Sequence, residues 1–235
     1  MQLRLCFTAI AMLALAACSG EDRAAQQRAQ AQAAAEAAAA KDAAAYQQLV
    51  AAQSWEIAQS IGREVVRKYP QSAAAAQVRQ SLAEVDAKAN AQIDGRRLAA
   101  LWAYQSGMQS GGEQHTASMY SKEPAGAQQV RLVLRRHAAW GQSVYLHGDA
   151  QGFGCGKPCV ANVRFDDAAP LKLEATIPEG GEPAMFIEDD KAFLSRMDAA
   201  QRVAFDIERK GAGRQTVVFE VGGYDASKWM QLRKP

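Results

Sequence analysis

The sequence is poor in the residues from which catalytic and metal sites are built. Its 235 residues include three histidines and four cysteines. His115, His137 and His147 have no close-spaced partner from which a zinc site could start. None accompanies a serine or cysteine in a nucleophile motif such as G-x-S-x-G. We therefore expect no catalytic residue, no metal and no cofactor, and we expect the histidines to face solvent from strands.

Long apolar runs are confined to the N-terminus, which reads MQLRLCFTAIAMLALAACSG. Arg4 is followed by an apolar run over 5–17, which is typical of a secretory signal and too short to span a bilayer. The last residues of this signal, Leu15 to Cys18, resemble the bacterial lipobox. The resemblance implies cleavage after residue 17 and acyl chains, palmitate among them, on Cys18, and several chains make a stable anchor. Ser19 in place of Asp implies sorting to the outer membrane; the alternative is an ordinary signal with a chance cysteine at its end.

An excess of charge of one sign is also missing. The predicted signal over 1–17 carries only Arg4, so removing it leaves 27 − 1 = 26 basic side chains against 25 acidic ones. A nucleic-acid partner would need a basic surplus, so we expect none. Seven basic residues make scattered positive spots, which fit either a solvated surface or a docking patch for an acidic partner or an anionic cell-wall polymer: Lys68, Arg79, Arg96, Arg97, Arg131, Arg135 and Arg136.

The stretch GFGCGKPCVANVRFDD, over 152–167, holds two of the cysteines. Pro158 stands where a phosphate-binding P-loop needs Ser or Thr, and Gln151 stands where it needs Gly. Cys155 and Cys159 are separated by three residues and run into a strand, whereas a redox pair needs Cys-x-x-Cys at a helix start. With Cys6 in the signal and Cys18 lipidated, we expect these two to form a structural disulfide contributing about 1–2 kcal/mol.

Two acidic clusters, Asp166-Asp167 and Glu188-Asp189-Asp190, offer alternatives of calcium binding or glycoside hydrolysis. The first lies where a strand enters a turn. The second lies where a helix begins, and carboxylates are favourable there. We therefore interpret both clusters as turn and capping residues.

The first half of the chain predicts helices. Residues 18–45 hold the lipidated end and an Ala/Gln-rich helix without an apolar stripe, which predicts an unpacked spacer of roughly 30 Å. Residues 46–100 predict a helical hairpin, with a first apolar face that includes Ile57 and Val65. Pro70 ends the first helix and Ser72 caps the second, whose stripe runs Val78, Leu82, Val85, Ala89 and Ile93. The step Tyr69 to Ser72 within 46–90 resembles a tetratricopeptide-like hairpin, although a free-standing array needs more repeats.

From Trp102 onward the apolar period changes from 3.6 to 2. Alternating segments separated by turn residues predict seven to nine short strands, as in Val203, Phe205 and Ile207 facing away from Asp206 and Glu208. One helix is expected after Asp189 or Asp190, and a closing turn is expected to dock Trp229. The fold class is therefore α+β, with N-terminal helices followed by an antiparallel β-sandwich-like or curled domain over 101–235.

This strand domain resembles the periplasmic VasI/TagO-like proteins associated with type VI secretion. The likeness covers roughly residues 100–230 and is one of layout. It is carried by the entry over 102–108, VRFDD over 163–167, MFIEDDKAFLSRM over 185–197 and VFEVGGYD over 218–225. The resemblance implies an accessory role at a secretion machine and no known catalytic motif.

Together these features predict a non-enzymatic lipoprotein that faces the periplasm and binds or scaffolds an envelope protein. The candidate partner-binding residues are Trp140, which is flanked by small residues in a hairpin loop, Phe153 and Lys157. Two alternatives to a general scaffold stay open: an accessory protein of a type VI-like secretion system, and an inhibitor or immunity protein against a cell-wall hydrolase. The second would use a protruding loop, for which 148–159 is the candidate.

Overall fold

The computed structural model describes residues 11–229, without the side chains of 11–20 and of residue 127. The signal segment over 1–10 and the side chain of Cys18 therefore lie outside the described residues. The chain divides into two compact units, Met1–Gln92 and Ile93–Pro235, called here the helical unit and the β-domain. None of the described helices has the length and apolarity that crossing a bilayer requires.

The helical unit consists of α1 (Ala11–Ala51), α2 (Trp55–Lys68) and the first part of α3 (Ala73–Ala100). The predicted spacer is helical, but its last turns are packed, since Ala39 and Ala43 are buried. An apolar stripe of large side chains is not needed there because alanine lets a neighbouring helix approach closely. The core of this unit gathers Ala43, Tyr46, Ala58, Val65, Ala75, Val78 and Val85.

The predicted helix boundary at Pro70 and the cap at Ser72 are confirmed. The Ser72 hydroxyl accepts a hydrogen bond from the Ala75 amide at 3.0 Å. The predicted inner face of α2 is wrong at one position, because Ile57 is 58% exposed while Ala58 is buried. Each residue turns a helix by about 100°, so the close packing of Ala58 and Gly62 against the core rotates Ile57 outward. Ile93, at the far end of the second predicted stripe, is exposed as well.

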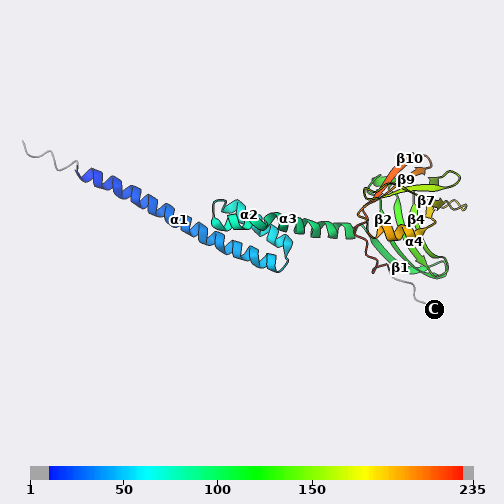
Figure 1. The fold of residues 1–235 in the computed structure, drawn as a ribbon, viewed down its shortest axis with the longest axis horizontal. Coiled ribbons are helices and arrows are strands. Elements are labelled where there is room, and N and C mark those ends of the chain that lie inside the picture. The colour runs from blue at the N-terminus through cyan, green and yellow to red at the C-terminus, as the bar shows by residue number, and fades with distance from the viewer. Residues whose placement is uncertain (1–10, 230–235) are drawn as a thin grey trace, which may run out of the picture. The chain divides into compact units, whose positions relative to one another are not determined.

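The α+β class is confirmed, with ten strands in the described β-domain (Figure 1). Their bounds are β1 (Ala103–Gln109), β2 (Gly112–Tyr120), β3 (Arg131–His137), β4 (Gly141–His147), β5 (Phe153–Gly154), β6 (Val160–Phe165), β7 (Leu171–Thr176), β8 (Ala184–Ile187), β9 (Val203–Arg209) and β10 (Gly213–Phe219). A short 3-10 helix, η1 (Gly126–Gln128), lies between β2 and β3. All pairings are antiparallel, in the order β1-β2-β3-β4-β8-β7-β6-β9-β10, with β5 on β9.

The strands form one curled sheet, a half-barrel, and not the two facing sheets of the predicted sandwich. The reason is connectivity, because β8 and β7 join the β1–β4 strands to the β6, β9 and β10 strands without a break. At the far edge, β10 is met by an isolated bridge between Val218 and Glu123, a residue from the segment that follows β2. The sheet therefore curls far enough for β10 to reach the chain at the end of β2.

The concave side of the half-barrel holds the core. Val203, Phe205 and Ile207 point into it, as their alternation predicts. α4 (Asp190–Met197) lies across the opening, as Figure 1 shows, with Phe193 packed on Phe165 and Phe205. Asp189 caps this helix by accepting from the Ala192 amide at 3.0 Å, which confirms the predicted helix start.

The predicted docking of Trp229 is confirmed. Its ring is buried, and its indole N–H donates to the carbonyl of His115 at 3.2 Å. A second tryptophan, Trp102, is buried beside Tyr224 and donates to the carbonyl of Val221. These two rings tie the chain after β10 to the first strands.

Candidate functional site

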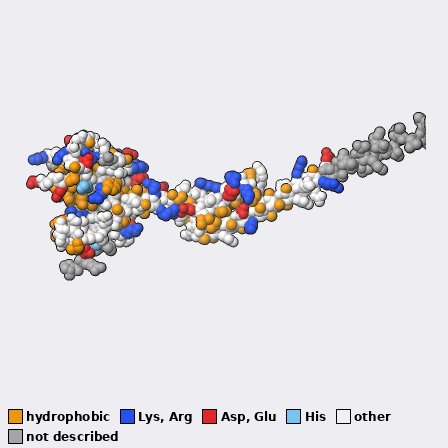
Figure 2. Space-filling view, turned by 180° about the vertical axis from the view of Figure 1, so that it is seen from behind, with side chains coloured by type: hydrophobic (Ala, Val, Ile, Leu, Met, Phe, Trp, Pro, Cys, Tyr) orange, Lys and Arg blue, Asp and Glu red, His pale blue; other side chains and the backbone are white. Residues whose placement is uncertain are grey.

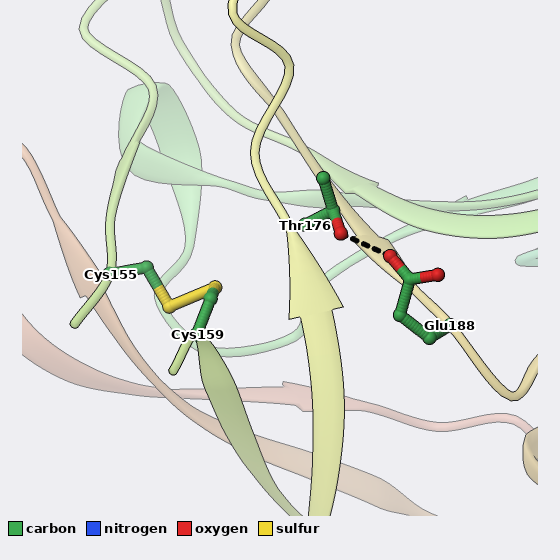
Figure 3. Close-up of a disulfide and its surroundings, with 4 residues drawn as sticks. All are labelled: Cys155, Cys159, Thr176 and Glu188. Carbon is green, nitrogen blue, oxygen red and sulfur yellow. Dashed lines mark hydrogen bonds between the residues drawn. A yellow bond between two sulfur atoms is a disulfide. The ribbon is translucent and has the colours of Figure 1, made fainter. Parts of the chain in front are cut away.

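The predicted disulfide is present in the loop between β5 and β6 (Figure 3). Cys155 and Cys159 are bonded, with their Cα atoms 5.2 Å apart, and both pack against the edge of the core. Lys157, at the tip of this loop, is exposed, so its predicted role in partner binding stays a prediction. The disulfide itself fixes a Gly-rich connection between two strands.

Phe153 was a candidate for partner binding, and the structure corrects this. Its side chain is 1% exposed and belongs to the core of the β-domain. The pairing of Phe153 with Arg209 on β9 turns its ring inward, where it lies against Gly148. A polar and glycine-rich sequence around it hid this contact, because two residues are too few to show an alternating pattern.

The acidic residues of the first cluster hold a turn. Asp166 adopts a positive φ of 49°, and its carboxylate accepts from the amides of Gln201 and Arg202 at 2.9 and 2.8 Å. Asp167 pairs with the Arg202 side chain at 2.9 Å. These contacts fasten the β6–β7 turn to the start of β9, as the turn interpretation predicts.

The second cluster serves the start of α4 and the neighbouring strands. Besides the capping Asp189, Asp190 accepts from the side-chain amide of Gln142 at 3.0 Å. Glu188 accepts a hydrogen bond from the hydroxyl of Thr176 on β7, drawn as the dashed line in Figure 3. Within residues 11–229, no group of three or more His, Cys, Asp and Glu side chains is placed to hold a metal ion.

The expectation that the histidines face solvent is wrong for two of the three. His115 and His137 are buried, because each satisfies its ring nitrogens locally. His115 Nδ1 lies 2.7 Å from the hydroxyl of Ser106 on β1. His137 Nδ1 accepts from the amides of Ala139 and Trp140, so its Nε2 carries the proton that bonds the Gln109 carbonyl at 2.8 Å. Both rings therefore connect β1 to other strands, His115 from β2 and His137 from β3.

A cleft of about 670 Å³ lies where the end of α3 meets β9 and β10. Its walls carry both signs of charge, and most of these groups already pair with one another. Arg97 forks onto Glu220 at 3.1 and 3.2 Å, and Lys122 reaches the same carboxylate at 3.3 Å. The hydrogen bond from Arg97 lowers the pKa of Glu220 most, and Lys122 lowers it further. These ion pairs therefore connect α3 and the loop after β2 to Glu220, which follows β10 directly.

The convex face of β3, β4 and β8 carries a different arrangement, an aromatic cluster around one arginine. Cross-strand pairing places Val133 beside Tyr145, and Tyr145 beside Phe186, whose ring centroid lies 4.8 Å away. The guanidinium of Arg135 lies 5.1 to 5.7 Å from the rings of Trp140, Tyr145 and Phe186. We call Arg135, Trp140, Tyr145 and Phe186 the aromatic face.

Trp140 is the exposed member of the aromatic face, with 51% of its surface accessible. Its ring stacks on His137 with centroids 3.8 Å apart and planes 13° apart. Because His137 is itself fixed by three hydrogen bonds, the tryptophan is held in place before any partner arrives. A large, rigid and half-exposed ring of this kind is typical of an interface hot spot.

The part of this surface formed by β2, β3 and β4 is positively charged. Arg131 and Arg135 lie on the same side of β3. The residues on this side of β2 and β4 are uncharged apart from the titratable His147. Burial lowers the pKa of His147, and the positive charge of Arg131 across the strand pair lowers it further. Elsewhere, Figure 2 shows basic and acidic side chains interspersed over the surface in view, as the charge balance of the sequence predicts.

Trp140, Arg131 and Arg135 could be singled out from the sequence, whereas Tyr145 and Phe186 were not predicted. A signal for Tyr145 was present, since Val144 and Leu146 are core residues and the residue between them must face the other way. Phe186 could not be placed beside it without knowing that β8 pairs with β4, which is not its neighbour in the sequence.

Comparisons with known proteins add little. No protein-family model and no curated protein matches the sequence. One similar solved structure is described as invasion associated protein B from Bartonella henselae. It is 16% identical, with a TM-score of 0.37, and the match covers 52% of this chain and 84% of that chain. Similarity at this level assigns neither a fold nor a function to the chain, so the interpretation rests on its own residues.

Proposed function

We propose that this chain is a lipoprotein of the outer membrane, facing the periplasm, and that its β-domain binds an acidic envelope protein through the aromatic face. The observation that carries the binding proposal is the Trp140 ring, half exposed and fixed on His137. The lipid anchor rests on the lipobox resemblance at Cys18, and the helical unit is the spacer between anchor and β-domain.

The chemistry of the aromatic face determines the kind of partner. Trp, Tyr and Arg are the residues that dominate binding energy at protein interfaces. The ring of Trp140 offers apolar contact area, while Arg135 and Arg131 supply positive charge with no carboxylate beside them on β2, β3 or β4. A partner that places an acidic side chain next to an apolar pocket would complement this surface.

Two narrower roles differ in the partner, and only the first would use the aromatic face. A secretion accessory protein, as the VasI/TagO-like layout suggests, would bind a component of the machine. An inhibitor of a cell-wall hydrolase would bind an enzyme, with the loop over 148–159 as the contact. Weakening of binding by Lys157→Ala, and not by Trp140→Ala, would favour the inhibitor.

The test places a photo-crosslinking amino acid at position 140 of the full chain in its native envelope. The matched control places it at Ile57, which is similarly exposed but lies in the helical unit. We expect one acidic protein to be captured from position 140 and not from position 57. A Cys18→Ser variant shows whether capture needs the anchor.

Purified protein then gives the magnitude. Truncating a hot-spot tryptophan costs about 2 kcal/mol or more, so Trp140→Ala should raise the Kd for the captured protein about 30-fold or more. Ile57→Ala should leave the Kd unchanged, and added salt should weaken binding. Equal capture from both positions, or an unchanged Kd for Trp140→Ala, would refute the aromatic face as the binding site.

A further inference from the structure

Within residues 11–229, the first strand of the half-barrel is an unprotected sheet edge. β1 pairs with β2 on one side, and its residues from Gln105 to Gln109 are all exposed. Apart from β2 and the ring of His137, which bonds the Gln109 carbonyl, no described residue hydrogen-bonds to the main chain of β1. Edge strands are usually protected by charged side chains, proline or bulges, and β1, with the sequence AYQSGMQ, has none of these.

The opposite edge of the same sheet is covered at one end, at Val218 of β10. The amide of Lys122 donates to the Val218 carbonyl at 2.7 Å, and the Val218 amide donates to the Glu123 carbonyl at 2.8 Å. These two bonds place a piece of chain along β10. The two edges therefore differ, because a described segment covers one end of β10 and none covers the open side of β1.

The hydrogen-bonding groups that β1 leaves free follow from its hairpin. Gln109 and Gly112 flank a two-residue turn, Ser110-Gly111, in which both residues have positive φ, so they form a hydrogen-bonded pair. Main-chain groups alternate in direction along a strand. Those of Tyr104, Ser106 and Met108 therefore point away from β2, toward the open side.

We propose that β1 pairs with β1 of a second copy of this chain, antiparallel, about a two-fold axis at Ser106. In this register Ser106 faces its own equivalent, and Tyr104 faces Met108 of the second copy. All of these residues carry free main-chain groups, so each hydrogen-bonded pair of the new ladder is complete. Met108, 74% exposed in the single chain, gains an aromatic neighbour.

A second copy is favoured over a different strand by charge and symmetry. A two-fold interface places the same residues against each other, so any charge would meet its like. The chain has no charged residue from Leu101 to Gly112, so self-pairing meets no repulsion along its whole length. The contact is small, so we expect a reversible dimer whose population rises with protein concentration.

The first test removes one outward amide. Met108→Pro deletes an N–H that faces away from β2, and proline is tolerated at an edge strand in that position. Met108→Thr removes the same side chain but keeps the amide. In sedimentation of the full chain in detergent, wild type and Met108→Thr should dimerise, while Met108→Pro should remain monomeric with unchanged circular dichroism.

The second test reads the register with single cysteines under mild oxidation. Residue 106 would lie about 5.5 Å from its equivalent between Cα atoms, within disulfide range. Residue 105 would lie diagonally, about 7–8 Å from its equivalent and out of range. Ser106→Cys should therefore form covalent dimers, and Gln105→Cys should not.

Three results would overturn the proposal: a monomer at every concentration, dimerisation of Met108→Pro as strong as that of Met108→Thr, or equal crosslinking at 105 and 106. Capture of another protein by the Ser106→Cys variant, in place of a second copy, would assign the edge to a foreign strand. None of these results bears on Trp140, which lies in the connection between β3 and β4, so this proposal and the proposed function fail separately.

Discussion

The buried pair of Arg209 and Asp149 allows a prediction in which a second mutation repairs the first. Arg209 lies at the end of β9 with its side chain 1% exposed, and its Nη2 donates to the Asp149 carboxylate at 2.6 Å. Its Nη1 donates to the Gln128 carbonyl at 2.6 Å, while its Nε has no partner among the described residues. The guanidinium is thus incompletely satisfied even in the intact protein.

The two partners should respond differently to removal. Removing one member of a buried pair costs about 3–5 kcal/mol because a charge is left uncompensated. Asp149 is 44% exposed, so water can replace part of its role, and we expect Asp149→Ala to cost about 2 kcal/mol. Arg209→Met replaces the charge with an apolar chain of similar volume, which changes stability by about 1 kcal/mol or less.

The double variant distinguishes the effect of a stranded charge from an ordinary loss of packing. Because Arg209→Met removes the charge that Asp149→Ala strands, the double variant should be more stable than Asp149→Ala alone. Urea unfolding followed by tryptophan fluorescence measures this, in a Trp55→Phe background so that the signal comes from the β-domain. A double variant no more stable than Asp149→Ala would refute the account of Arg209 as a stranded charge.

Three further predictions concern single contacts. Ser72→Ala should lower the free energy of unfolding of the helical unit by about 1 kcal/mol through loss of the α3 cap, measured by circular dichroism in urea. Gly223→Ala should destabilise the β-domain because an added Cβ would lie 2.2 Å from the main chain of Leu98, whereas Gly180→Ala, with open space around it, should not; equal melting temperatures would contradict this. Burial raises the pKa of Tyr224 to about 12. The unfolded chain therefore loses this proton first, near pH 10, and stability should fall between about pH 10 and pH 12, a loss that Tyr224→Phe should reduce.

The sequence predicted those parts of the fold that depend on local pattern. The alternation through Val203, Phe205 and Ile207 was enough to place β9 and its inner face, and the Asp189 cap was visible from its spacing to the helix. β1 shows no alternating pattern of its own, because its side chains are almost all exposed. The burial of Phe153 was missed because the contact depends on a pairing with β9, far away in the sequence.

The candidate functional site could likewise be predicted only in those parts that depend on local pattern. Trp140 could be singled out from its position in a hairpin loop, but its rigidity depends on His137, whose burial no single-strand pattern indicates. The aromatic face as a whole depends on the order of β3, β4 and β8 in the sheet. Patterns within one strand determine which side a residue faces, whereas the neighbours on that side are determined by topology.

The bridge between Glu123 and Val218 has a consequence for how far association can proceed. A sheet with two free edges could add copies at both sides and grow into a filament. Here the pairing of β1 with β1 would use the edge that the described residues leave free, while the other edge is occupied at Val218 by a segment of the same chain. Assembly would therefore stop at two, and a change that detaches the segment over 121–124 from β10 would convert a terminating dimer into a polymerising one.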